Sequence, residues 1–190
     1  YRLSTGLPSS RSMLKGFSGY YERRGFILKW IQFWQYGNFF EKHLEMNAGL
    51  LFSNIDKEII TLNIGGISNI TYLSKNKKRE EVIGFDTGPG MSLVDKAVNK
   101  LFGNSYDIDG IFSKKGKINY NLLNHLMKHD FIIKIPPKST DIEEFGSILL
   151  EQIISKSKSI DSYDIIRTLI QFTVDSINYN IIKFINLKDI

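Results

Sequence analysis

The clearest hydrophobic pattern in the chain lies between residues 58 and 86, where short runs of β-branched residues alternate with turn residues. The run at 59–64 (Ile-Ile-Thr-Leu-Asn-Ile) ends at Gly65 and Gly66, and the run at 69–73 (Asn-Ile-Thr-Tyr-Leu) follows. A third run covers 82–85. Short β-branched runs bounded by glycine are typical of strands. The pattern therefore predicts three consecutive strands.

Beyond residue 90 the apolar positions change to the period of a helix. They recur at i, i+3, i+4, i+7 and i+8, as Val94, Ala97, Val98, Leu101 and Phe102. The predicted helix starts after Pro89 and Gly90, because proline and glycine mark the turn before it. A turn is predicted at 106–110, and then a short helix with Ile118, Leu122 and Leu126 on one face.

Two more helices are predicted in the last third of the chain. The Pro136-Pro137 pair interrupts the chain, and the spacing of Thr140 and Glu143 is that of a capping box, which predicts a helix start there. The buried stripe of this helix is expected to hold Ile142, Phe145, Leu149 and Ile153. The last helix is predicted to open at Ser162. Its apolar stripe comprises Ile165, Ile166, Leu169, Ile170, Ile177 and Ile181.

Three strands followed by helices predict an α/β fold, with α+β also open, in which a meander or mixed sheet is covered by helices. We assign residues 50–190 to this domain. Residues 1–49 form a separate N-terminal segment, because the aromatic stretch 25–40 contains both tryptophans and follows neither period. This segment is either non-native sequence or the remnant of a first lobe. Its aromatic residues are expected in a core or interface rather than stacked on bases.

The composition excludes several classes of function. With 42% hydrophobic and 24% charged residues, the 190-residue chain is typical of a folded domain. The absence of cysteine excludes disulfides, thiolate nucleophiles and cysteine-bound zinc, and three scattered histidines predict no metal site. No apolar run reaches the roughly 18–20 residues of a membrane span. The net charge of +5 allows nucleic-acid binding, but the one dense basic cluster, at 75–79, is interpreted as a solvated hairpin turn.

Asp86 is the first candidate for chemistry. It follows an apolar run and precedes Thr87-Gly88-Pro89-Gly90, so we expect it at the end of a strand, in a loop whose glycines leave backbone N–H groups bare. A carboxylate placed there can take a proton from water. The alternative is structural, since Asp86 could instead cap the helix that follows.

The glycine pair Gly65-Gly66 is the second candidate. Paired glycines between two strands let backbone N–H groups approach a phosphate closely. A plain hairpin turn needs the same glycines, so both interpretations stay open from this segment alone.

Taken together, these segments resemble one family. Residues 62–71 resemble the strand-turn-strand signature of the anhydro-N-acetylmuramic acid kinase family, and residues 84–90 resemble its catalytic loop. Three further segments, 106–110, 136–140 and 164–173, are similar to that family in the same order. Five ordered matches between about residues 50 and 185 form a specific signal.

The resemblance implies a half of an actin-like ATPase and a kinase of peptidoglycan recycling. Members of the family convert 1,6-anhydro-N-acetylmuramic acid, with water and ATP, to N-acetylmuramic acid 6-phosphate. Asp86 is then the base that activates the water. The implied substrate-binding residues are Thr87, Gly88, Pro89 and Gly90, and the implied phosphate-binding residues are Asn63, Gly65, Gly66, Asn69 and Lys138. The resemblance further implies ATP and Mg²⁺ as cofactors, a cytoplasmic location and a family-like homodimer, with neither nucleic acid nor membrane as a partner.

The chain also departs from the family pattern. Met91 stands where the family usually has Asn, and Asp141-Ile142 replaces a Gly-Arg pair. The family's glycine-rich first phosphate loop and its triple-glycine adenosine segment have no counterpart in the sequence. We therefore expect an incomplete member with weak ATP binding and very low turnover. The alternative is an inactive remnant or partner lobe without independent catalysis.

Overall fold

A computed structural model describes residues 27–30, 58–74 and 82–185 of the chain, with the backbone alone described at 27–30. Within these ranges the strands are β1 (Ile27–Trp30), β2 (Ile59–Ile64), β3 (Ile67–Leu73) and β4 (Ile83–Pro89). The helices are α3 (Ser92–Phe102), α4 (Tyr120–Leu126), α5 (Asp130–Ile133), α6 (Ser147–Lys156) and α7 (Ser162–Phe184), with short 3₁₀ turns η2 (Ile108–Gly110) and η3 (Ser113–Lys115).

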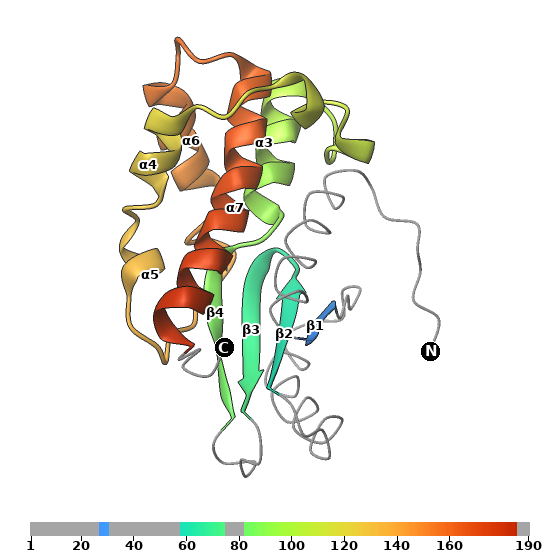
Figure 1. Ribbon diagram of the computed structural model, residues 1–190. Helices are drawn as coiled ribbons and strands as arrows, with labels where there is room; N and C mark the ends of the chain where they lie inside the picture. The colour runs from blue at the N-terminus through green and yellow to red at the C-terminus, as the bar shows by residue number, and fades with distance from the viewer. Residues whose placement is uncertain (1–26, 31–57, 75–81, 186–190) are drawn as a thin grey trace.

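The strands form one mixed sheet in the order β1-β2-β3-β4 (Figure 1). β2, β3 and β4 make an antiparallel meander, while β1 pairs parallel to β2. The predicted α/β class, with a mixed sheet and covering helices, is confirmed. β1 falls within the segment 1–49, and the domain boundary at residue 49 stays a prediction. The basic cluster at 75–79 and the rest of the aromatic stretch lie outside the described residues.

Two of the three predicted strands are longer than expected. β3 begins at Ile67, and β4 continues through Pro89. Asp86 and Thr87 therefore lie inside a strand, and the prediction of a loop starting at Asp86 is wrong. The reason is that β4 is bonded on both sides here: Asn69 of β3 pairs with Asp86, and the Asp86 N–H donates to the Lys138 carbonyl across the other edge (3.1 Å).

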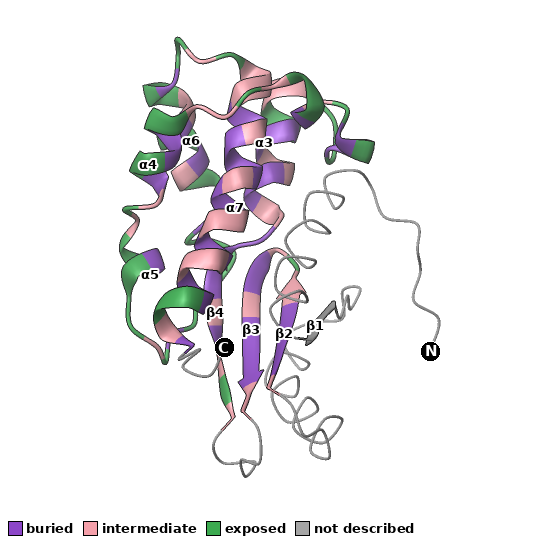
Figure 2. Cartoon of the chain, viewed as in Figure 1, coloured by how far each residue is buried: buried purple, intermediate pink, exposed green. Residues whose placement is uncertain are grey.

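The helices gather on one side of the molecule, and α7 runs down along β4 (Figure 1). Leu62, Ile70 and Phe85, which are paired across β2, β3 and β4, are buried beneath Ile177 and Ile181 of α7. A second hydrophobic cluster lies among the helices, where Phe145 and Phe172 are fully buried (Figure 2). The predicted helices at α3 and α7 are confirmed. No helix in the described part of the chain is both long and apolar enough to cross a membrane.

The predicted capping box at Thr140 is wrong. α6 begins at Ser147, after Gly146, and residues 142–145 form turns instead. The Asp141 carboxylate caps those turns by accepting from the N–H groups of Glu143 and Glu144 (2.9 and 3.1 Å). Ile142, expected in the buried stripe, is exposed. The Thr140 N–H instead donates to the Asp86 carboxylate (2.8 Å).

Candidate active site

Three of the predicted site residues form one row across the sheet. Asn63 of β2 pairs with Asn69 of β3, which pairs with Asp86 of β4. Directly paired residues point to the same face of a sheet, and neighbours along a strand point to opposite faces. Because Leu62, Ile70 and Phe85 are buried under α7, the polar row lies on the opposite face. All three of its side chains are partly exposed, so the row is open to a ligand.

The Asp86 carboxylate is held through one of its two oxygens. Oδ2 accepts from the Thr140 N–H (2.8 Å) and the Ser139 hydroxyl (3.0 Å). Oδ1 has no hydrogen-bond donor among the described residues. Asp86 therefore does not cap α3, whose N-cap residue is Met91, and the structural alternative to catalysis is wrong.

Burial raises the pKa of the Asp86 carboxyl above its ordinary value. The Thr140 N–H, the Ser139 hydroxyl and the Lys138 ammonium offset part of that increase because they favour the ionised form. A general base works best when its pKa approaches the working pH. The environment of Asp86 thus favours proton transfer more than that of an exposed aspartate.

A β-bulge between β3 and β4 separates Asp86 from the residues that follow it. Ser68 pairs with Gly88 and Asn69 pairs with Asp86, so Thr87 is the extra residue. The hydroxyls of Ser68 and Thr87 lie 2.7 Å apart, and that of Ser68 also contacts the carbonyls of Gly88 and Pro89 (3.1 and 3.0 Å). Bulges re-aim side chains beside active sites. Here the bulge turns Thr87 into the interior.

The predicted substrate-binding residues Thr87, Gly88, Pro89 and Gly90 are all buried. This arrangement contradicts the expectation of bare backbone groups in this segment. Asn180 of α7 donates to the Thr87 carbonyl (3.1 Å), and Thr173 of α7 donates to the Gly90 carbonyl (2.8 Å). These four residues are buried next to Asp86, and two of them are hydrogen-bonded to α7. Their direct contact with substrate stays a prediction.

The Gly65-Gly66 hairpin is docked on the start of α3. The N–H groups of Met91 and Gly90 donate to the carbonyls of Gly65 and Gly66 (2.8 and 2.9 Å), and the Ser92 hydroxyl donates to Gly66 as well (2.9 Å). The N–H of Ser92, the first residue of α3, also donates to the Gly66 carbonyl (3.3 Å). The hairpin is confirmed, whereas phosphate binding by Gly65 and Gly66 stays a prediction.

Lys138 is buried, and its ammonium group points at α5. Nζ donates to the carbonyls of Phe131 and Ile132 (2.9 and 3.0 Å) and lies 5.0 Å from the centre of the Phe131 ring. Burial, reinforced by the nearby Lys134 charge, lowers the pKa of Lys138 from its ordinary value near 10.5 to about 8, while Asp86 acts the other way. This placement does not favour the predicted phosphate contact, which stays a prediction.

The lowered pKa of Lys138 predicts a pH-dependent stability. Between pH 8 and pH 10.5 the unfolded chain binds more protons at this residue than the folded chain, so the contribution of Lys138 to the free energy of unfolding rises with pH. We subtract the free energy of unfolding of Lys138→Met from that of wild type. We expect this signed difference to rise by about 2 kcal/mol from pH 8 to pH 10. Urea unfolding at both pH values measures it. A difference that stays constant or shrinks contradicts the prediction.

The described residues do not form a phosphate or Mg²⁺ site on their own. No group of three His, Cys, Asp or Glu side chains in the described ranges could hold a metal ion. Proteins usually bind Mg²⁺ through one or two carboxylates together with substrate phosphates. The polar row offers one carboxylate, and the nearby Lys138 ammonium is directed at α5 carbonyls. Among the described residues, the row therefore has no cation directed at it that would bind a triphosphate.

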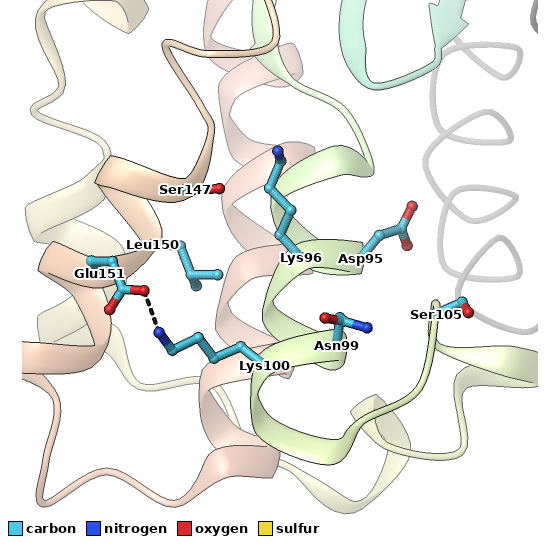
Figure 3. Close-up of a pocket in the computed structure, with 8 residues that line it drawn as sticks. All are labelled: Asp95, Lys96, Asn99, Lys100, Ser105, Ser147, Leu150 and Glu151. Carbon is cyan, nitrogen blue, oxygen red and sulfur yellow. Dashed lines mark hydrogen bonds and ion pairs between the residues drawn. The ribbon is translucent and has the colours of Figure 1, made fainter.

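A separate depression of about 410 Å³ lies between α3 and α6 (Figure 3). Lys100 and Glu151 are joined by an ion pair across it. Its full lining comprises Asp95, Lys96, Asn99, Lys100, Ser105, Ser147, Leu150 and Glu151. None of these residues belongs to the polar row, so this depression is not part of the candidate site.

Comparison with known proteins decides the family. A model of the family described as anhydro-N-acetylmuramic acid kinase matches residues 44–187, well over half of the chain. The chain belongs to the anhydro-N-acetylmuramic acid kinase family. The actin-like ATPase fold implied by the resemblance is the fold of this family. As its name states, the family consists of kinases, which use a nucleotide.

Several curated relatives carry the same name. The chain is 43% identical over 136 residues to the anhydro-N-acetylmuramic acid kinase of Clostridioides difficile (strain 630), covering 72% of this chain and 36% of the relative. It is 43% identical over 132 residues to that of Shewanella sp. (strain ANA-3), covering 70% and 35%. For Shewanella amazonensis the identity is 41% over 136 residues, covering 72% and 36%. The chain thus spans about a third of the length of these relatives.

Sequence reasoning missed four residues of this site. Ser139 lies in a family-like segment and was given no role, Thr140 of the same segment was given only the role of a helix cap, and Ser68 lies within another such segment. Their serine and threonine side chains gave no separate signal. Asn180 lies far along α7, and only the fold brings it to Thr87.

Proposed function

We propose that the chain carries the sugar-facing part of a kinase that converts 1,6-anhydro-N-acetylmuramic acid, with water, to N-acetylmuramic acid 6-phosphate in peptidoglycan recycling. The observation that supports this most directly is the row Asn63–Asn69–Asp86, with Oδ1 of Asp86 uncommitted on a partly exposed face. The 43% identity to a named kinase of the family agrees with it. We place the reaction in the cytoplasm, with the amino sugar and ATP as partners and a homodimer as the assembly.

Asp86 is the group that starts the reaction. Its Oδ1 takes a proton from water, and the water oxygen bonds to the anomeric carbon of the sugar. The bond from that carbon to the bridging O6 breaks, and its electron pair stays on O6, which bonds to the transferred phosphoryl group. ATP would supply that phosphoryl group, and ADP would leave with the electron pair of the broken bond. Mg²⁺, held with the phosphates by the remainder of such a kinase, would neutralise their charge. Asn63 and Asn69 can each donate an amide N–H to the ligand from the same face.

In this proposal, the chain supplies one part of the active site rather than the whole of it. Phosphoryl transfer depends on positioning and on charge stabilisation around the phosphates. The described residues provide a base but no cation directed at the row. We therefore expect the purified chain, incubated with ATP, Mg²⁺ and the anhydro sugar, to give no phosphosugar by mass spectrometry. Clear product from the chain alone contradicts this division of roles.

A chimera tests the catalytic assignment. Residues 58–185 replace the matching segment of the Clostridioides difficile relative, which supplies the remainder of a kinase. Because the chain contributes the base and the sheet that carries it, we expect the chimera to phosphorylate the anhydro sugar. The unaltered relative is the positive control. A chimera that folds, as judged by circular dichroism, yet forms no phosphosugar overturns the proposed function.

A further inference from the structure

The segment 138–140 closes the outer edge of β4 around Asp86. The Asp86 N–H donates to the Lys138 carbonyl (3.1 Å), and the Thr140 N–H donates back to Oδ2 of the Asp86 side chain (2.8 Å). The Ser139 hydroxyl, from the residue between them, reaches the same oxygen (3.0 Å). Three consecutive residues therefore fix both the main chain and the carboxylate of Asp86. We call residues 138–140 the clamp.

The clamp is anchored from inside the protein. Lys138, at its first position, is 5% exposed, and its ammonium group is bonded to two carbonyls of α5. Ser139, in contrast, is exposed, so its side chain is not part of the hydrophobic core. β3 already pairs with β4 along its inner edge and holds it in the sheet. The contact of the Ser139 hydroxyl with the Asp86 carboxylate is therefore not needed for that purpose.

The two donors leave the carboxylate asymmetric. Both bond to Oδ2, so the carboxylate cannot rotate without losing a charge-assisted hydrogen bond, and such bonds are stronger than neutral ones. Oδ1 stays available on the row of Asn63 and Asn69. The donors to the ionised form also offset part of the rise that burial causes in the pKa of Asp86.

We propose that Ser139 is a positioning residue that holds Oδ2 of Asp86, so that Oδ1 is the oxygen that receives the proton from water. This inference rests on the proposed role of Asp86 as the base, but its geometric part concerns this chain alone. The Lys138 ammonium is the only charged group among the described residues that acts on the Asp86 carboxylate. From β3 and β2 the facing groups are the uncharged amides of Asn69 and Asn63.

The test is a titration of Asp86 in the 190-residue chain, without sugar or ATP. Aspartate carboxyl carbons are labelled with ¹³C, and the Asp86 resonance is assigned by its loss in Asp86→Asn. In Ser139→Ala we expect the titration midpoint of Asp86 to move to higher pH than in wild type, because one donor to the ionised form is lost. In Ser139→Thr, which keeps the hydroxyl, we expect the wild-type midpoint.

Thr140→Ala is the matched control. Among the described residues, the Thr140 hydroxyl donates a hydrogen bond only to the Asp141 carbonyl (3.5 Å), and the backbone N–H of Thr140, which binds Asp86, remains in the variant. Its Asp86 midpoint should equal that of wild type, and Asp175 should titrate alike in all variants. An unchanged midpoint in Ser139→Ala, or an equal shift in Thr140→Ala, overturns the proposal. Because the titration involves no turnover, an inactive chimera would overturn the proposed function and leave this result standing.

Discussion

Replacing Asp86 with Asn in the chimera is expected to lower kcat by about a thousandfold, since general-base catalysis contributes roughly 10²–10⁴ in rate. Asn has the shape of Asp and can still accept from Ser139 and Thr140 through its amide oxygen. It cannot take a proton from water. The variant therefore removes the chemistry and keeps the fold. Initial rates of phosphosugar formation, followed by mass spectrometry at saturating sugar, measure the change.

Asp175→Asn is the control for the loss of a half-buried carboxylate. Burial raises the pKa of Asp175 as it does that of Asp86, but Asp175 lies on α7, outside the polar row, and pairs with Gln171 (2.8 Å). We expect this variant to keep kcat within about twofold of the parent chimera, as for substitutions remote from the chemistry. If Asp86→Asn retains more than a tenth of the parent kcat, Asp86 is not the base.

The meander and its partner helices follow from patterns that the sequence carries locally. The run at 59–64 is β-branched and stops at two glycines, and the structure has β2 at those residues. The periodic positions Val94, Ala97 and Val98 are buried as one face of α3. Such patterns are reliable because burial of one face determines both the period and the element.

The interior of the site could not be predicted in the same way, because long-range contacts determine it. Asp86 was expected in a loop because glycine and proline follow it, yet pairing with β3 and with the Lys138 carbonyl extends β4 past it. Thr140 has the spacing of a capping residue, but its N–H is bound to a carboxylate 54 positions earlier in the chain. Local propensity competes with such partners and loses to them.

Lys138 is the clearest example of a side chain whose direction could not be predicted from the sequence. A lysine near a family-like segment suggests a phosphate ligand when only the sequence is known, since ammonium groups are common phosphate binders. The fold turns this side chain inward, where the carbonyls of Phe131 and Ile132 receive it. The direction of a long side chain depends on which backbone groups the fold leaves without hydrogen-bond partners. Those groups cannot be predicted from the sequence alone.

A large loss of stability is expected from Gly90→Ala. A Cβ at this position would overlap the Gly65 carbonyl oxygen and lie 3.0 Å from the Gly66 carbonyl oxygen, and both are backbone atoms that cannot rotate away. The substitution would therefore push the hairpin off the start of α3 and break the bond from the Gly90 N–H to Gly66 (2.9 Å). We expect a loss of about 3 kcal/mol in the free energy of unfolding, at the upper end for overpacking.

Gly65→Ala in the same hairpin is the matched control. Among the described residues, its Cβ would approach only the Ile67 carbonyl, at 3.6 Å, which is an ordinary contact. We expect it to change the free energy of unfolding by less than about 0.5 kcal/mol, as for an exposed position. Urea unfolding of the 190-residue chain, followed by circular dichroism, compares the two variants with wild type. Equal losses at Gly65 and Gly90, or a loss below about 1 kcal/mol at Gly90, would mean that the hairpin is not held against α3 by close backbone packing. In that case the polar row would lack the fixed support on which the catalytic proposal depends.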